Sequence, residues 1–366
     1  MDEGMHALNR TLNLLLLVSA FSLSLVGLAF VHSAGSYWGT VHYTNALPFI
    51  VKQGVYMAIA VLLAFILMHS KLLSNKQFWT FFFYAVLIML ILVKVPGIGA
   101  VRNGSQSWII LGPISLQPAE FAKVAVIGKL SSELAHLRTY RNVFRWQHMM
   151  IILAPIVLIM LQPDLGSAVI LIAAAFTVLF LAGYRLRFFV LIGALGVFAL
   201  IALIVSAPYR LNRIRSFVDP WHDPLGAGFQ SIQSLFAVSP GGILGHGYGE
   251  SRQKYLYLPE PQNDFIFSII AEEIGFIGAT LIIGLFMVFL ITALRLAVQL
   301  SSRFAFFIVS GMAMMIFVQT FLNIGVVSGL LPVTGVTLPF ISYGGSSLLT
   351  TWFATGTILH FTMRKS

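Results

Sequence analysis

The sequence predicts an all-α polytopic membrane protein, and two observations support that fold class. Of the 366 residues, 58% are hydrophobic and only 9% are charged, whereas a soluble domain carries about 25% charged residues. The apolar residues also gather in long runs, and a run of about 20 is enough for a helix to cross a bilayer. We therefore expect one integral-membrane domain covering residues 1–366, without a separate soluble module.

Ten apolar segments are expected to be spanning helices. They cover residues 12–32, 50–68, 77–95, 118–135, 148–162, 165–182, 188–206, 265–295, 304–325 and 345–362. Only Gln162, Pro163 and Asp164 separate the fifth from the sixth. Because proline interrupts a helix, we expect a tight turn there, with Asp164 capping the sixth helix. One long kinked helix is the alternative, but it would be too long for a single crossing.

The basic residues predict the orientation in the membrane. An even number of spans places both termini on one side, and Lys and Arg accumulate in cytoplasmic loops. The loops on the side of the termini contain almost no acid and hold Lys71, Lys76, Arg138, Arg141, Arg145, Arg185, Arg187, Arg295, Arg303, Arg364 and Lys365. Both termini are therefore expected in the cytoplasm, with residues 207–263 forming a large extracytoplasmic loop between the seventh and eighth helices. The same rule explains the net charge of +10, so we expect no nucleic-acid partner.

Three outer loops predict a roofed cavity on the extracytoplasmic side. Residues 96–117 are Gly-rich and polar, and 326–347 are apolar but interrupted by Pro332, Pro339 and several glycines. Irregular backbone near a membrane persists where it is buried in protein or lines a watery cavity. In the long loop, a short amphipathic helix in the membrane interface is predicted. Its apolar face would hold Phe229, Ile232, Leu235 and Phe236, with Gln230, Gln233 and Ser234 off that face.

Two charged residues open the fourth segment, where charge is costly and usually functional. Glu120 and Lys123 are three residues apart after Pro118, so they share one helix face and can pair. The sequence leaves two compatible roles open: a neutral ion pair that holds helices together, or a group that faces the substrate.

Asp264 lies where the polar loop becomes apolar helix, and the residues alone leave two roles open. It can cap the eighth helix, as Asn263 also can, or it can be a catalytic carboxylate. The basic residues Arg210, Arg213 and Arg215 can likewise extend to lipid head groups or bind a pyrophosphate. The absence of cysteine excludes disulfides and thiol chemistry, and the histidines form no zinc motif.

Five blocks of the sequence resemble one protein family. They are NGSQSWIILGPISLQPAEFAK at 103–123, QPDLGSA at 162–168, RIRSFVDPWHDPLGAGFQSIQSLFAV at 213–238, GESRQKYLYLPEPQNDFIFSIIAEEIGFIG at 249–278 and LPVTGVTLPFISYGGSS at 331–347. With these blocks the chain resembles the SEDS family (shape, elongation, division and sporulation), and its long loop is most similar to the FtsW and SpoVE branch. One departure is Gln106-Ser107-Trp108, where members often carry a base beside the tryptophan, which leaves Arg102 as the local cation.

The resemblance implies a ten-helix glycosyltransferase that polymerises lipid II into peptidoglycan strands, with Asp264 as the essential acid and Glu120 and Lys123 as functionally important residues. It also implies a class B penicillin-binding protein as partner, along the eighth and ninth helices, and a place in the bacterial cytoplasmic membrane, at the division septum or forespore membrane. Membrane lipids are the remaining partners. A lipid II flippase is the alternative activity, and a scaffold for the division or sporulation machinery is the third.

Inverting sugar transfer needs one base and cations for the leaving pyrophosphate. We expect Asp264 to be the base, with its pKa raised by burial near Glu272 and Glu273. No cofactor is certain, and a divalent cation is left open. Substrate-binding or supporting roles are expected for Glu120, Lys123, Arg102, Arg210, Arg213, Gln233, Glu272 and Ser342.

Overall fold

The computed structural model describes residues 2–43, 47–102, 105–112, 114–136, 146–205, 215–226, 228–255 and 257–363. Within these ranges, the side chains of residues 2–6, 41–43, 47–48, 102, 111, 114, 197 and 199–205 are not described. The chain is mostly helical. Every apolar segment expected to span the membrane falls on one of the helices α1 (Asp2–Tyr43), α2 (Leu47–His69), α3 (Lys76–Leu92), α4 (Pro118–Leu134), α5 (Trp146–Met160), α6 (Leu165–Leu181), α7 (Leu186–Val205), α10 (Ile266–Val298), α11 (Arg303–Val327) and α12 (Gly345–Met363).

Four helices in the described part of the chain, α1, α2, α10 and α11, are long and apolar enough to cross a membrane by length and composition. Helices α3, α5 and α6 are apolar but shorter, at 15–17 residues. Helices α4 and α12 carry charged residues or many Ser and Thr, and nearly all their residues are buried. Their polar composition therefore reflects contact with protein rather than with lipid.

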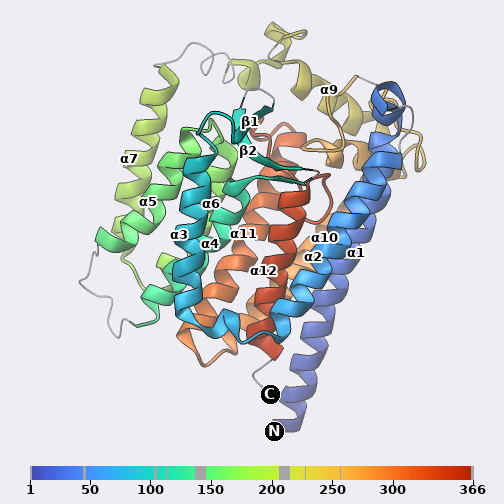
Figure 1. Cartoon of the computed structure of the whole chain (residues 1–366). Coiled ribbons are helices and arrows are strands. Elements are labelled where there is room, and N and C mark those ends of the chain that lie inside the picture. The colour runs from blue at the N-terminus through green and yellow to red at the C-terminus, as the bar shows by residue number, and fades with distance from the viewer. Residues whose placement is uncertain are drawn as a thin grey trace.

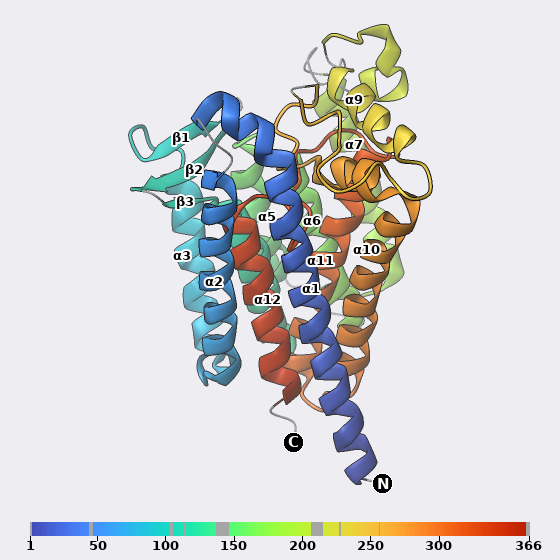
Figure 2. The ribbon, with the colours of Figure 1, turned by 90° about the vertical axis from the view of Figure 1, so that its right-hand side faces the viewer.

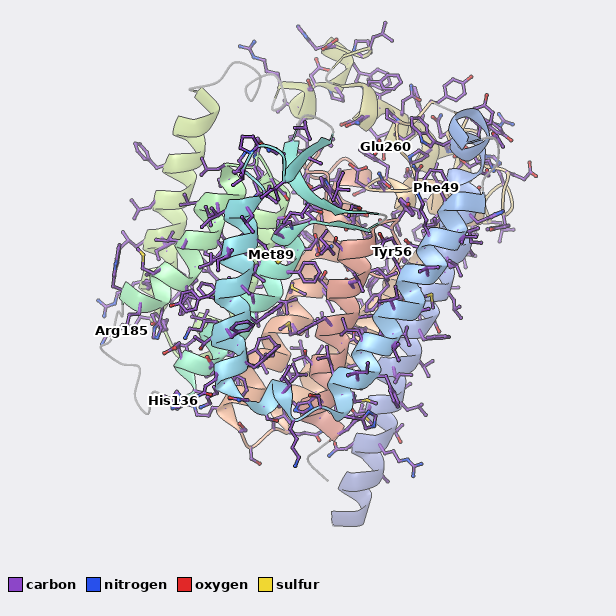
Figure 3. The ribbon with its side chains drawn as sticks, in the orientation of Figure 1. Phe49, Tyr56, Met89, His136, Arg185 and Glu260 are labelled. Atoms are coloured by element: carbon purple, nitrogen blue, oxygen red, sulfur yellow. The ribbon has the colours of Figure 1, made fainter. Side chains whose placement is uncertain are left out.

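The two ends of the helical bundle are different (Figure 1). The beginning of α1 and the end of α12 lie at one end, whereas α9 (Phe229–Val238) and the strands lie at the other, as Figure 2 also shows. In Figure 3, Glu260 lies at the end that carries α9, and His136 and Arg185 lie toward the opposite end. We call the end with α9 the loop end and the other the terminal end.

A small antiparallel sheet occupies the first loop at the loop end, which the all-α prediction did not include. Strands β1 (Gly99–Arg102), β2 (Ser105–Leu111) and β3 (Ile114–Leu116) pair in that order. The hydroxyls of Ser105 and Ser107 on β2 donate to the carbonyl of Gln162 in the turn between α5 and α6. The sheet is thereby joined to the helices below it.

The short helix predicted in the long loop exists as α9, but its buried face differs from the prediction. Ile232, Ser234 and Ala237 are buried, whereas Phe236 is exposed. The Ser234 hydroxyl donates to the carbonyl of Val327 at the end of α11, over 2.9 Å. The helix packs on α10 and α11, so protein contacts, rather than the membrane interface alone, decide which residues face inward.

Helix α10 is interrupted at Gly275, whose φ of +65° is non-helical. A Cβ at this position would lie 2.3 Å from the nitrogen of Gly245, so only glycine fits the site. The long loop bonds to the backbone around the interruption: Phe276 donates to the carbonyl of Gly242 over 2.9 Å, and Gly247 donates to that of Glu273 over the same distance. The residues from Ile266 to Ile274 therefore form a separate short helix at the loop end.

The apolar segment after α11 is irregular, as its proline and glycine content predicts, and its second half is buried. We call residues 331–341 the 331–341 loop. Its side chains Leu338, Phe340 and Ile341 are buried, and the backbone of Tyr343 just beyond it donates to the carbonyl of Gln262 over 2.8 Å. The second half of the loop therefore lies inside the protein, next to the segment that leads into α10, whereas Pro332 and Gly335 are exposed.

Candidate active site

Asp264 lies at the loop end, immediately before α10. The N-cap residue of that helix is Phe265, and its side chain makes no capping bond. The Asn263 amide donates instead to Glu260 over 2.7 Å. The start of α10 therefore does not use Asp264 as its N-cap, which was one of the two roles that the sequence left open.

The Asp264 carboxyl is half-buried, and its pKa is higher than that of an ordinary aspartate. Loss of hydration raises its pKa to about 6, the negative charge of Glu260 adds to the rise, and its own backbone N–H opposes it. The expected direction is confirmed, but the neighbouring charge is Glu260 rather than Glu272 or Glu273. A carboxyl with a pKa near neutrality is suited to accept a proton at physiological pH.

The 331–341 loop and α11 surround Asp264. A Cβ added to Gly335 would lie 3.9 Å from Oδ2 of Asp264, so the carboxyl faces this loop. The backbone carbonyl of Asp264 accepts a hydrogen bond of 2.7 Å from the side-chain amide of Asn323 on α11, and the same amide donates to the carbonyl of Val336 over 2.7 Å. Asp264 is thus tied to α11 through its backbone.

Glu120 and Lys123 form a buried ion pair on α4. The Lys123 ammonium lies 2.8 Å from Oε1 of Glu120 and 2.7 Å from Oε1 of Gln319 on α11, and its side chain is 1% exposed. The other carboxylate oxygen of Glu120 accepts from the Thr350 hydroxyl on α12 over 3.1 Å. The pair therefore joins α4, α11 and α12, the first of the two roles that the sequence left open.

Gln319 connects this ion pair to the 331–341 loop. Its amide donates to the carbonyl of Thr337 over 3.1 Å and to the hydroxyl of Ser347 over 3.3 Å. The Thr337 and Ser347 hydroxyls are themselves 2.8 Å apart. Lys123 and Asp264 consequently belong to one hydrogen-bonded assembly, built around a single loop.

Asp164 caps α6, as expected from the sequence. Its carboxylate accepts from the backbone and the hydroxyl of Ser167, over 2.9 and 2.7 Å, and from the Gln117 amide over 3.2 Å. Loss of hydration raises its pKa, against the Ser167 bonds and the positive charge of Lys123. Asp164 is therefore also electrostatically coupled to the ion pair, which its role as a helix cap did not indicate.

Glu272 and Glu273 anchor the long loop. Glu272 is fully buried and accepts from the Ser251 hydroxyl over 2.5 Å and from the backbone of Arg252 over 2.8 Å. Glu273 accepts from the Ser33 hydroxyl on α1 over 2.5 Å. Glu272 therefore supports the long loop, and it is not among the residues around Asp264.

The remaining expected site residues are dispersed. Ser342 is buried, and its hydroxyl accepts from the backbone of Leu338 over 2.8 Å, so it stabilises the 331–341 loop. Gln233 is half-buried on α9. Arg102 lies on β1 but its side chain is not described, and Arg210 and Arg213 lie outside the described residues.

Three residues of this assembly were not expected from the sequence: Gln319, Asn323 and Thr337. Gln319 and Asn323 are polar, uncharged and one helical turn apart within a largely apolar segment. That spacing places both amides on one face of a helix, and it is the signal by which they could have been found. In the described ranges, no group of three or more His, Cys, Asp or Glu residues is placed to hold a metal ion.

A hollow of about 570 Å³ lies at the opposite end of the bundle from Asp264. Its lining includes Lys76, Arg303 and His360, where α3 and α11 begin and α12 ends. None of the expected site residues lines it. The candidate active site is therefore the assembly around Asp264 at the loop end.

Comparisons with known proteins match almost the whole chain. A profile of the FtsW/RodA/SpoVE family, described as "Cell cycle protein", matches residues 13–366. Stage V sporulation protein E of Bacillus subtilis (strain 168) is 43% identical over 357 residues, which are 95% of this chain and 96% of the relative. A protein of Geobacter sulfurreducens named "Probable peptidoglycan glycosyltransferase FtsW" is 37% identical over 359 residues, with 96% and 95% covered.

Solved structures have the same fold. A chain from a peptidoglycan synthase complex, studied for the coordination of polymerization and crosslinking, matches with a TM-score of 0.75 and 32% identity, over 95% of this chain and 96% of that one. The rod shape determining protein RodA of Thermus thermophilus matches with a TM-score of 0.71 and 28% identity, over 95% of each chain.

Proposed function

We propose that this chain, which belongs to the FtsW, RodA and SpoVE family, is a peptidoglycan glycosyltransferase that polymerises lipid II on the outer face of the cytoplasmic membrane. The observation that carries the proposal is Asp264, a half-buried carboxyl with its pKa raised to about 6, which faces the 331–341 loop. Relatives named as probable peptidoglycan glycosyltransferases, at 37% identity over nearly the full length, support the same activity. A role at the division septum or the forespore membrane agrees with the names of these relatives.

The proposed topology has ten spans, with both termini in the cytoplasm and the 207–263 loop outside. It is supported by the position of the α1 start and the α12 end at the same end of the bundle, opposite α9 (Figure 1). Helices α3 and α11 begin with the basic residues Lys76 and Arg303. Both residues lie at the terminal end, and the positive-inside rule places this end in the cytoplasm. Asp264 then faces the outer leaflet.

In the proposed reaction, the Asp264 carboxylate removes the proton from the acceptor sugar hydroxyl. The resulting oxygen attacks the anomeric carbon of the donor sugar. The new C–O glycosidic bond forms as the bond from that carbon to the diphosphate breaks, and undecaprenyl diphosphate leaves with the bonding electron pair. One direct displacement inverts the anomeric configuration from α to β, so that a single base suffices and no second carboxylate nucleophile is needed.

The leaving diphosphate requires cationic groups. Lys123 is bound on two sides, by Glu120 and Gln319, and its burial favours a supporting role within the protein. From the sequence, Lys123, Arg210 and Arg213 were the candidates for diphosphate binding, and we now assign that role to the loop bases Arg210 and Arg213, with Arg102 as a further base of the outer loops. Glu120 and Lys123 support the site by holding Gln319, and through it the 331–341 loop.

A class B penicillin-binding protein is the proposed partner, with α10 and α11 as its binding surface. The similarity to a chain of a peptidoglycan synthase complex supports a partner of this kind. Helix α10 exposes Phe276 and Leu281, and α11 exposes Phe321. Such apolar side chains suit contact with a single membrane-spanning helix or with lipid.

The proposed activity is tested with purified protein, lipid II and the penicillin-binding partner, whose transpeptidase is blocked. We expect glycan strands that lengthen with time on a gel, together with release of undecaprenyl diphosphate. The same preparation is assayed for lipid II flipping in sealed vesicles. Protein that flips lipid II and never polymerises it would replace the enzyme with the flippase alternative.

The topology predicts which engineered cysteines an impermeant thiol reagent can reach, and the chain has no native cysteine. Ser239→Cys and Glu250→Cys, at exposed positions of the long loop, are expected to react in intact cells. Ser302→Cys, exposed at the start of α11, is expected to react only after permeabilisation. Labelling of the Ser302 position from outside would contradict the proposed orientation.

A further inference from the structure

The amide of Asn323 joins the two backbone segments that meet at the candidate active site. Its nitrogen donates to the carbonyl of Asp264 and to the carbonyl of Val336, each over 2.7 Å. Because an amide nitrogen carries two hydrogens, both bonds can form at once. Asn323 is 1% exposed, so water does not compete for either carbonyl.

We propose that Asn323 is a positioning residue that sets the place of the Asp264 carboxyl relative to the 331–341 loop. This inference rests on the proposed function, in which Asp264 is the general base. Asp264 lies before the N-cap of α10, outside the regular hydrogen bonds of that helix. The bond from Asn323 to its carbonyl therefore fixes a backbone that the helix itself does not hold.

The orientation of this amide is set by its surroundings. Two carbonyl acceptors can be satisfied only by the nitrogen, because an amide oxygen pointed at them would repel both. The oxygen Oδ1 of Asn323 is buried, and none of the described residues forms a hydrogen bond with it. A buried polar atom without a partner lowers stability, but an apolar side chain here would take the donor away from the carbonyls of both Asp264 and Val336. The two bonds of the nitrogen are therefore set against the cost of the buried oxygen, and they fix the positions of the two carbonyls.

Gln319, one helical turn from Asn323, binds the 331–341 loop in the same way. Its amide holds Thr337, the residue after Val336, while its oxygen accepts from Lys123. Helix α11 thus presents two amides on one face, and they hold consecutive residues of the 331–341 loop. One rigid helix sets the position of that loop with respect to both Asp264 and the ion pair.

The test uses Asn323→Leu, which keeps the approximate size of the side chain and removes both donors. A misplacement of about 1 Å in an active site can cost on the order of 10²-fold in rate. We therefore expect kcat for glycan polymerisation, in the complex with the penicillin-binding partner, to fall about 10- to 100-fold. KM for lipid II is expected to stay within about threefold, because the loss is in alignment rather than in substrate binding.

The matched control is Thr320→Val on the same helix. Thr320 is also buried, but its hydroxyl donates to the carbonyl of Ile316 within α11, so its loss leaves the loop in place. We expect wild-type kcat for this variant. A double variant, Asn323→Leu with Asp264→Asn, is expected to be no slower than Asp264→Asn alone. Once the base is absent, its misplacement cannot lower the rate further.

The outcomes separate this inference from the proposed function. An inactive Asp264→Asn with a fully active Asn323→Leu would overturn the positioning role and leave the base in place. A fully active Asp264→Asn would disprove the assignment of Asp264 as the base. A higher KM at unchanged kcat, or rate losses that multiply in the double variant, would also overturn positioning. If Asn323→Leu is recovered in poor yield, Asn323→Thr, which keeps one hydrogen-bond donor, is tested instead. A reduced kcat at unchanged KM would then support the positioning role, and an unchanged kcat would refute it.

Discussion

Asp264→Asn is expected to fold normally and to lose nearly all polymerase activity. The substitution keeps the size of the side chain but removes the carboxylate that accepts the proton, and the loss of a general base typically costs about 10²–10⁴-fold in rate. Folding should be preserved because the N-cap of α10 is Phe265, and because Asn323 binds the backbone carbonyl at position 264, which the substitution retains. The measurement is the rate of glycan-strand formation from lipid II, with the thermal unfolding midpoint as the test of folding.

The pH dependence of the wild-type rate gives a second sign of the same base. The pKa of Asp264 is raised to about 6, and only the deprotonated carboxyl accepts a proton. The rate should therefore be maximal above this pH and fall about tenfold per unit below it. Glu260 contributes to the raised pKa, so Glu260→Gln should move the acid limb to lower pH.

The control for charge is Glu250→Gln, at an exposed position in the same long loop. It removes one carboxylate from the outer face without affecting Asp264, and we expect its polymerisation rate to match that of the wild type. Near-normal polymerisation by folded Asp264→Asn would disprove the catalytic assignment.

The apolar segments and the Asp164 cap could be predicted from the sequence because both depend on local chemistry. A run of apolar residues requires burial in lipid or protein. Asp164 follows Pro163 in the turn that leads into α6. The pairing of Glu120 with Lys123 is also local, since three residues separate them on one helix face.

The features that the sequence did not reveal depend on contacts between distant segments. Strands β1–β3 are short and lie in a Gly-rich loop, and β2 is held by the carbonyl of Gln162, which no local pattern indicates. Ser234 is on the buried face of α9 because Val327 lies opposite. Asn323 bonds to Asp264, 59 residues away, and an uncharged amide in an apolar segment gives no strong signal by itself.

The second large effect is expected at the buried ion pair. Lys123→Met removes the cation and leaves the Glu120 carboxylate with the Thr350 hydroxyl as its described partner. Removing one member of a buried pair typically costs about 3–5 kcal/mol, because the remaining charge is uncompensated. Glu120→Gln leaves the Lys123 ammonium with the neutral Gln319 oxygen as its described partner, so its cost should be of similar size and of the same sign. Both variants should polymerise slowly, since Gln319 holds the loop beside Asp264.

A comparison pair on the same helix provides the control. Lys129 and Glu133 lie 2.5 Å apart, with side chains 11% and 39% exposed. Glu133 reaches water, and Lys129 keeps the Thr80 hydroxyl on α3 as a second partner, so losing one member should cost less than in the fully buried pair. Lys129→Met and Glu133→Gln should therefore change the unfolding midpoint and the polymerisation rate much less than the substitutions at the buried pair.

The double variant, Glu120→Gln with Lys123→Met, decides whether the two residues act as one unit. If their main role is to neutralise one another and to hold α4, α11 and α12 together, removing both charges leaves neither uncompensated. The double variant should then be no less stable and no less active than the worse single variant, which is a coupling that a double-mutant cycle measures directly. Losses that add in stability and multiply in rate would instead assign Glu120 and Lys123 two independent roles, one of which would be contact with the substrate.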